Sequence, residues 1–95
     1  ADPETLAYHY GAAGRADKAL VFTERAADRA SESLAFDHAV DLYRTALRLA
    51  SAPEATRRVR RKLADVLSSA GRGAEAAAEY LALSESDEGT AARTW

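Results

Sequence analysis

The chain has 95 residues, which suits one domain with room for four or five helices and a modest hydrophobic core. It contains no cysteine, which excludes disulfides and thiolate metal sites, and its net charge of −2 gives no general attraction to nucleic acids or membranes. No apolar run approaches the roughly 20 residues of a membrane-spanning helix. The first residues do not show the charged, apolar and small-residue regions of a secretory signal peptide.

Amino-acid usage predicts the kind of source and the compartment. The sequence has 24 alanines and 11 arginines against 2 lysines, and it lacks Ile, Asn, Gln and Met. Because this bias favours GC-rich codons, we expect a high-GC bacterium, and the missing Met predicts a piece cut from a longer protein. The lack of cysteine fits a reducing compartment, so the expected location is the cytoplasm.

The first two predicted helices cover residues 3–13 and 16–32. Asp2 is an N-cap, Pro3 stands at the first helical position, and Gly14 ends the first helix. In the second helix, apolar residues recur at helical spacing and predict an inward face. That face holds Ala19, Leu20, Ala26, Ala27 and Ala30.

Three further helices are predicted over residues 36–50, 53–70 and 73–84. The fourth begins at a capping box in which Ser51 and Glu54 satisfy each other's backbone donors. The third has the clearest apolar stripe of the chain, with spacings of three and four residues. Its members are Phe36, Ala39, Val40, Tyr43, Ala46, Leu47 and Ala50, and the fourth helix offers Val59, Leu63, Val66, Leu67 and Ala70.

Residues 85–95 show no apolar period and are predicted to form a polar tail outside a helical domain of residues 1–84. Trp95 is interpreted as an arbitrary end or as a contact on the last helix. No segment alternates apolar and polar residues with period two, so no strand is expected. Because short turns make neighbouring helices antiparallel, the predicted fold class is all-α, with five antiparallel helices.

The sequence also repeats itself. The segments LAYHYGAAGRADKALVFTERA and LADVLSSAGRGAEAAAEYLAL match at an offset of 57 residues, which pairs Gly14 with Gly71. Other matches are 37 residues apart and pair Tyr43 with Tyr80. The middle copy has only its second half, because Leu34 stands where glycine is expected. A period in the thirties built from two helices is typical of a solenoid.

These repeats resemble the tetratricopeptide repeat, a helix pair with small residues, a glycine between the helices, and Ala and Tyr at fixed offsets. The resemblance implies a right-handed α-α superhelix that binds a protein or peptide. It places Ala19, Ala39 and Ala76 where two helices cross closely. Tyr43 and Tyr80 then fill the gaps between consecutive hairpins.

A second resemblance concerns the origin of the chain. The segments YHYGAAG, RADKAL and FDHAVDLYRTALRLA look like the helical region that follows the nucleotide-binding module in large bacterial signalling ATPases. Some of these are fused to kinase, cyclase or DNA-binding domains. The resemblance implies the sensor or scaffold part of such a protein, and the ATPase itself is not in this chain.

Charged residues on the second and fourth predicted helices are the candidate partner-binding groove. Glu24, Asp28 and Glu32 form an acidic stripe, and a basic run on the fourth helix would be its neighbour if both helices line the inside of a solenoid. One interpretation is internal ion pairing, worth ~0–1 kcal/mol for each exposed pair. The other is recognition of phosphate or an acidic peptide. The candidate residues are Glu24, Asp28, Glu32, Arg58, Arg61, Lys62 and Asp65.

Asp65 excludes one known use of tetratricopeptide grooves, the clamp of basic and asparagine side chains that grips a C-terminal carboxylate. Arg58, Arg61 and Lys62 lie on the right face, but the asparagine position one turn after Arg61 holds Asp65. An acid there repels a carboxylate. A nucleic-acid site is not expected either, because no aromatic residues are interleaved with the arginines.

No catalytic site is expected. The chain has no P-loop, no G-x-S-x-G and no H-E-x-x-H, and His9 and His38 are interpreted as surface residues on different helices. The prediction is a non-catalytic interaction or scaffold module without a cofactor or metal. Its expected partner is a protein, a peptide or another domain of its own chain. The alternative is a structural spacer without a ligand. A homodimer through exposed terminal helices is also expected.

Overall fold

The computed structural model describes the backbone of residues 2–94 and the side chains of residues 2–86, and Trp95 lies outside them. The described chain consists of helices and short turns, without a strand, which confirms the predicted all-α class. The helices are α1 (Pro3–Ala12), α2 (Ala16–Glu32), α3 (Phe36–Leu49), α4 (Pro53–Ser69) and α5 (Gly73–Thr94). None of the described helices is both long and apolar enough to cross a membrane.

The bounds of α1 to α4 agree with the predicted bounds to within one residue, but α5 is longer than predicted. It continues to Thr94, through residues expected to form a polar tail. The expectation was wrong because an apolar period reports burial, whereas a helix that has already started gains one hydrogen bond for each residue that extends it. No proline interrupts residues 85–94.

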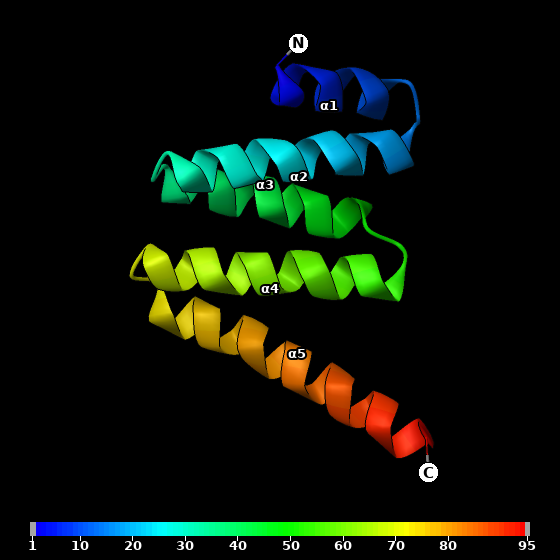
Figure 1. Ribbon diagram of the computed structural model, residues 1–95, viewed down its shortest axis with the longest axis vertical. Helices are drawn as coiled ribbons and strands as arrows, with labels where there is room; N and C mark the ends of the chain where they lie inside the picture. The colour runs from blue at the N-terminus through cyan, green and yellow to red at the C-terminus, as the bar shows by residue number, and fades with distance from the viewer. Residues whose placement is uncertain (1, 95) are drawn as a thin grey trace.

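The helices form a row in chain order, each packed against the next (Figure 1). The row is flat, with extents of 46 × 31 × 15 Å. Because each connection has only three residues, successive helices run in opposite directions. The first helix packs against α2. A closed four-helix bundle would instead require the first helix to pack against α4. The right-handed superhelical sense stays a prediction.

Three of the four turns share one backbone geometry. Gly14, Leu34 and Gly71 have positive φ angles of 74°, 63° and 76°. In each turn the next amide donates to a carbonyl five residues back, the arrangement of a Schellman motif. These bonds are Arg15 N to Tyr10 O at 2.8 Å, Ala35 N to Ala30 O at 2.8 Å, and Arg72 N to Leu67 O at 2.9 Å. The leucine that replaces the expected glycine therefore takes the glycine conformation.

The hairpin α2–α3 is repeated by the hairpin α4–α5 at an offset of 37 residues. The first residues of α2 and α3, Ala16 and Phe36, correspond to Pro53 and Gly73 at the start of α4 and α5. The positive-φ residues of the two hairpin turns keep the same offset. Residues at this offset can therefore be compared as equivalent positions in two copies of one unit.

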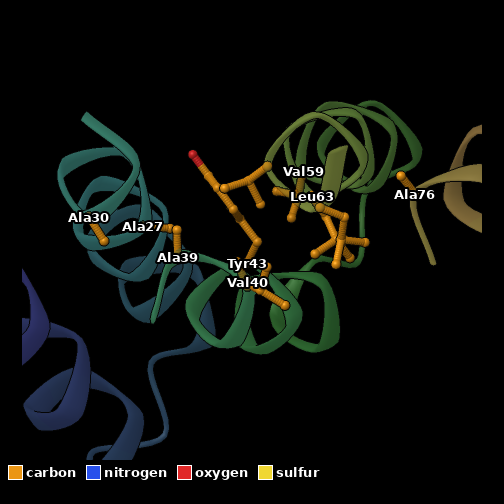
Figure 2. Close-up of a cluster of buried hydrophobic side chains, with 11 residues drawn as sticks. Ala27, Ala30, Ala39, Val40, Tyr43, Val59, Leu63 and Ala76 are labelled. Carbon is orange, nitrogen blue, oxygen red and sulfur yellow. The ribbon is translucent and has the colours of Figure 1, made fainter. Parts of the chain in front are cut away.

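The core lies between α2, α3 and α4 (Figure 2). Tyr43 rises from α3 into the gap between α2 and α4, with Val59 and Leu63 on the α4 side and Ala27 on the α2 side. Its exposed fraction is 3% and that of Leu67 is 0%, which confirms that both are buried. The largest fully buried side chains are Leu63, Leu67, Val40 and Val59. The first helix contributes no buried residue.

Candidate functional site

Four of the predicted residues form one charge cluster between α2 and α4: Glu24, Asp28, Arg58 and Lys62. The Arg58 guanidinium donates two hydrogen bonds to the Glu24 carboxylate, from Nε at 2.9 Å and from Nη2 at 2.8 Å. The Lys62 ammonium lies 2.7 Å from Glu24 Oε2 and 3.1 Å from Asp28 Oδ2. The paired, planar geometry makes the Arg58–Glu24 contact the most specific of these interactions.

The charge cluster is attached to the core through Tyr43. The Tyr43 hydroxyl donates to Asp28 Oδ1 at 2.5 Å, and the ring of the same residue packs between α2 and α4. Burial raises the pKa of the Tyr43 hydroxyl far above its ordinary value, and the hydrogen bond to Asp28 raises it further. The hydroxyl is therefore a fixed neutral donor that orients the Asp28 carboxylate.

The electrostatics of the charge cluster favour the ionised forms of Glu24, Arg58 and Lys62. The hydrogen bond from Arg58 lowers the pKa of Glu24 below its ordinary value, although burial opposes this. Burial alone would lower the pKa of Lys62, but hydrogen bonds to Glu24 and Asp28 outweigh burial and the pKa is raised. Since the side chain of Glu24 is only 12% exposed, an external anion or cation would have to displace these partners to bind.

The other three predicted residues lie outside the charge cluster. Glu32 is exposed, because eight residues of helix turn it about 80° away from Glu24. Arg61 is also exposed and forms no ion pair with a described side chain. Asp65 accepts a hydrogen bond from the Tyr80 hydroxyl at 2.5 Å. The structure thus brings together only part of the predicted acidic stripe and basic run.

The basic run on α4 does not make one surface, because successive helical residues point in different directions. Arg58 and Lys62 reach α2, whereas Arg60 Nη1 contacts Glu79 Oε1 of α5 at 2.9 Å. The Arg60–Glu79 pair is largely covered, with the two side chains 28% and 17% exposed. Positively charged side chains of α4 therefore connect it to α2 and to α5.

A second feature, which the sequence analysis missed, is an apolar groove between α1 and α3, with α2 as its floor. We call it the α1–α3 groove, and its volume is about 430 Å³. The side chain of Tyr8 lines one wall and is 75% exposed. The remaining lining residues are Glu4, Ala7, Gly11, Ala12, Ala19, Thr23, Leu42, Thr45 and Leu49. The small residues one turn apart on the first helix, Ala7 and Gly11, are compatible with such a groove, but short side chains are equally compatible with close packing.

The 37-residue offset shows why this groove is open. Thr23 and Leu42 of the groove correspond to Arg60 and Glu79, and these two residues form the ion pair between α4 and α5. In the second unit, the two long side chains of this ion pair fill the space. In the first unit, the shorter or apolar side chains of Thr23 and Leu42 leave it open. The two units therefore differ at these positions, which are open in the first unit and filled by the ion pair in the second. A smaller cavity of about 250 Å³ remains in the second unit and is lined by Arg44 and Arg48, the counterparts of Ala7 and Gly11.

The first helix, which forms one wall of this groove, is joined to α2 and α3 by a few side-chain contacts. The rings of Tyr10 and Phe22 stack at a centroid distance of 5.6 Å, and His38 Nε2 lies 2.8 Å from Glu4 Oε1. Asp2 accepts a hydrogen bond from the backbone amide of Thr5 at 3.1 Å and so caps the helix. His38 thus joins α1 to α3, where the sequence suggested only a surface residue.

Comparison with known proteins gives no relative: no family model matches the chain, and no curated protein and no solved structure matches it.

Proposed function

We propose that this chain is a non-catalytic protein-interaction module of the tetratricopeptide type. In this proposal it is the helical sensor or scaffold part of a larger bacterial signalling protein and acts in the cytoplasm. It binds an apolar peptide segment of a partner or of another domain of its own chain. The observation that carries the proposal is the α1–α3 groove, which is open, mainly apolar and has a volume of about 430 Å³.

The chemistry of the groove favours a peptide segment. Ala7, Gly11 and Ala12 have short side chains or none, so a ligand backbone can approach α1 closely. Leu42 and Leu49 supply apolar surface on the opposite wall. Pockets with a mainly apolar lining are typical sites for the apolar anchors of a binding partner.

The charge cluster is a poorer binding site than the groove. Its carboxylates and its cations already satisfy one another, and Arg58 and Lys62 both contact Glu24. A ligand gains little by exchanging one such pair for another, because the largely covered Glu24 carboxylate would lose its partners. We therefore assign the charge cluster to holding α4 against α2, and the α1–α3 groove to binding.

The experiment fills the groove with a side chain of the protein itself. A Cβ added at Gly11 meets no atom within 4 Å, so Gly11→Leu places a leucine in the groove without a backbone clash. Gly73→Leu is the matched control, because Gly73 is equally unobstructed and lies outside the groove. Peptides selected from a displayed library against the natural chain are then measured against both variants.

The proposal expects peptides with apolar anchors whose affinity falls at least about tenfold in Gly11→Leu and is unchanged in Gly73→Leu. Nuclear magnetic resonance should place their contacts at Leu42 and Leu49. If no peptide is selected, or if filling the groove leaves binding intact, the proposal fails. The chain would then be better described as a structural spacer between flanking domains.

A further inference from the structure

Tyr80 is the counterpart of Tyr43, 37 residues later, and the two hydroxyls make the same hydrogen bond. Tyr43 donates to Asp28 and Tyr80 donates to Asp65, in both cases at 2.5 Å and 15 residues back along the chain. Their environments differ, because Tyr43 is 3% exposed and Tyr80 is 41% exposed. The tyrosine that makes this hydrogen bond is therefore buried in the first unit and exposed to solvent in the second.

The helix that covers Tyr43 is α4. It places Val59 and Leu63 against the tyrosine ring, and it carries two cations to the acids of α2. Arg58 pairs with Glu24, and four residues later Lys62 reaches Asp28. The covering helix is therefore recognised by two charges one turn apart and by apolar residues that follow each of them.

The equivalent surface on α4 and α5 has no covering helix among the described residues. We call it the terminal face, and it comprises Arg61, Asp65, Ala77, Tyr80 and Ser84, all of which are exposed. These are the counterparts, in order, of Glu24, Asp28, Val40, Tyr43 and Leu47. It lies at the α5 end of the row, away from α1 (Figure 1).

One charge differs between the two surfaces and defines the partner. Asp65 keeps the negative charge of Asp28, whereas Arg61 replaces the acid Glu24 by a base. We propose that the terminal face binds an amphipathic helix that carries an acidic residue opposite Arg61 and, four residues later, a basic residue opposite Asp65. In the partner helix, an apolar residue directly follows the acidic residue and another directly follows the basic residue, and these two apolar residues cover Tyr80. The partner helix has the same position relative to α4 that α4 has relative to α2.

A second copy of this chain does not supply such a helix. The sequence has one acidic residue followed four positions later by a base, Glu54 and Arg58, and Arg58 already donates to Glu24 within the folded chain. The occupant is therefore a helix with a different sequence. The homodimer expected from the sequence would then use α1. The terminal face goes beyond the proposed function, because it lies apart from the α1–α3 groove.

The test uses α4 itself as a template for the missing helix. Two stapled peptides carry the sequence of residues 53–69, one unchanged and one with Arg58→Glu, with the staple on the side away from the apolar residues. The staple removes the cost of folding a short helix. Both peptides are titrated into the full chain and into its Arg61→Glu variant, whose terminal face carries the same charges as the first unit.

The natural chain should bind the Arg58→Glu peptide roughly threefold to tenfold more tightly than the unchanged peptide, because an attraction replaces a repulsion at Arg61. Arg61→Glu should reverse this preference. Ala77→Glu should abolish binding of both peptides. Ala77 is exposed on the terminal face, and a charged side chain there would keep the apolar residues of the peptide from packing on the Tyr80 ring. Gly11→Leu should leave binding unchanged, which separates this result from that of the groove.

Three results would overturn the proposal: no binding of either peptide, the same preference in both proteins, or binding that survives Ala77→Glu. The last would mean that the peptide displaces the internal α4. Self-association of the chain that Ala77→Glu abolishes would assign the terminal face to a second copy and would also overturn it. Thermal unfolding of each variant, followed by circular dichroism, establishes that the folded state is intact.

Discussion

Leu34 holds a backbone conformation that leucine seldom adopts. Its φ of 63° matches the 74° of Gly14 and the 76° of Gly71 in the equivalent turns. A side chain with a Cβ destabilises this conformation by roughly 1–2 kcal/mol. The side chain of Leu34 is 72% exposed, so burial does not compensate for the strain within the described fold. The three-residue connection imposes the conformation, because the Schellman hydrogen bonds need it.

Leu34→Gly should therefore stabilise the protein. Relief of the strain exceeds the extra entropy of glycine in the unfolded chain, about 0.4–1 kcal/mol, by a small margin. We expect the free energy of unfolding in urea to rise by up to ~1 kcal/mol. The reciprocal change Gly71→Leu should lower it by a similar or larger amount. A loss of stability in Leu34→Gly would show that the leucine side chain makes a stabilising contact.

The charge cluster makes a prediction about pH. The pKa of Glu24 is lowered in the folded state by the hydrogen bond from Arg58. As the pH falls, the unfolded chain therefore takes up a proton at this residue before the folded chain does. The resulting stabilisation is present above the unfolded pKa of about 4.3 and is lost as the pH falls through the folded value.

Glu24→Gln should accordingly be less stable than the natural chain at pH 7, and the difference should shrink at pH 3. Urea unfolding at the two pH values measures this. Glu32→Gln is the control for net charge, because it removes one negative charge from an exposed position on the same helix. An equal difference at both pH values would mean that the Arg58–Glu24 pair contributes nothing through its charge.

At the scale of the elements, helix bounds were predictable because proline and turn preferences are local. The predicted Ser51–Glu54 capping box was wrong, since the N-cap of α4 is Ala52 and no side chain caps it. Pro3, Gly14 and Gly71 mark helix ends through their own backbone preferences, so each was correctly located from the sequence. The C-terminal end of α5 was not, because nothing local stops that helix at residue 84. Burial at equivalent positions also could not be predicted, since it depends on which neighbour covers them.

The first helix should be the least stable element. It contributes no buried residue, and its side-chain contacts with the rest of the chain include the Tyr10–Phe22 stack and the exposed Glu4–His38 pair. Its backbone amides should exchange with deuterium faster than those of α3 and α4, which carry the fully buried core side chains. Phe22→Ala should accelerate this exchange further. Equal protection of α1 and α3 would contradict this ranking.

At the scale of the whole molecule, the charge cluster was only partly predictable from the sequence, and the α1–α3 groove was not predicted. The contact of Glu24 with Arg58 follows from two charged helices side by side, and the sequence anticipated it. The role of Tyr43 in orienting Asp28 did not follow, because it depends on a side chain that crosses from α3. The α1–α3 groove was missed since a cavity results from side chains that are short, and shortness alone predicts close packing equally well.

The central claim is that the molecule consists of equivalent units, of which the first is covered and the last presents an open face. Hydroxyl-radical footprinting with mass spectrometry tests this most directly, because it measures the solvent exposure of individual tyrosine rings. The account predicts fast labelling of Tyr8 and Tyr80 and protection of Tyr43 in the free chain. Protection of Tyr80 equal to that of Tyr43 would contradict it, because the terminal face would then already be covered.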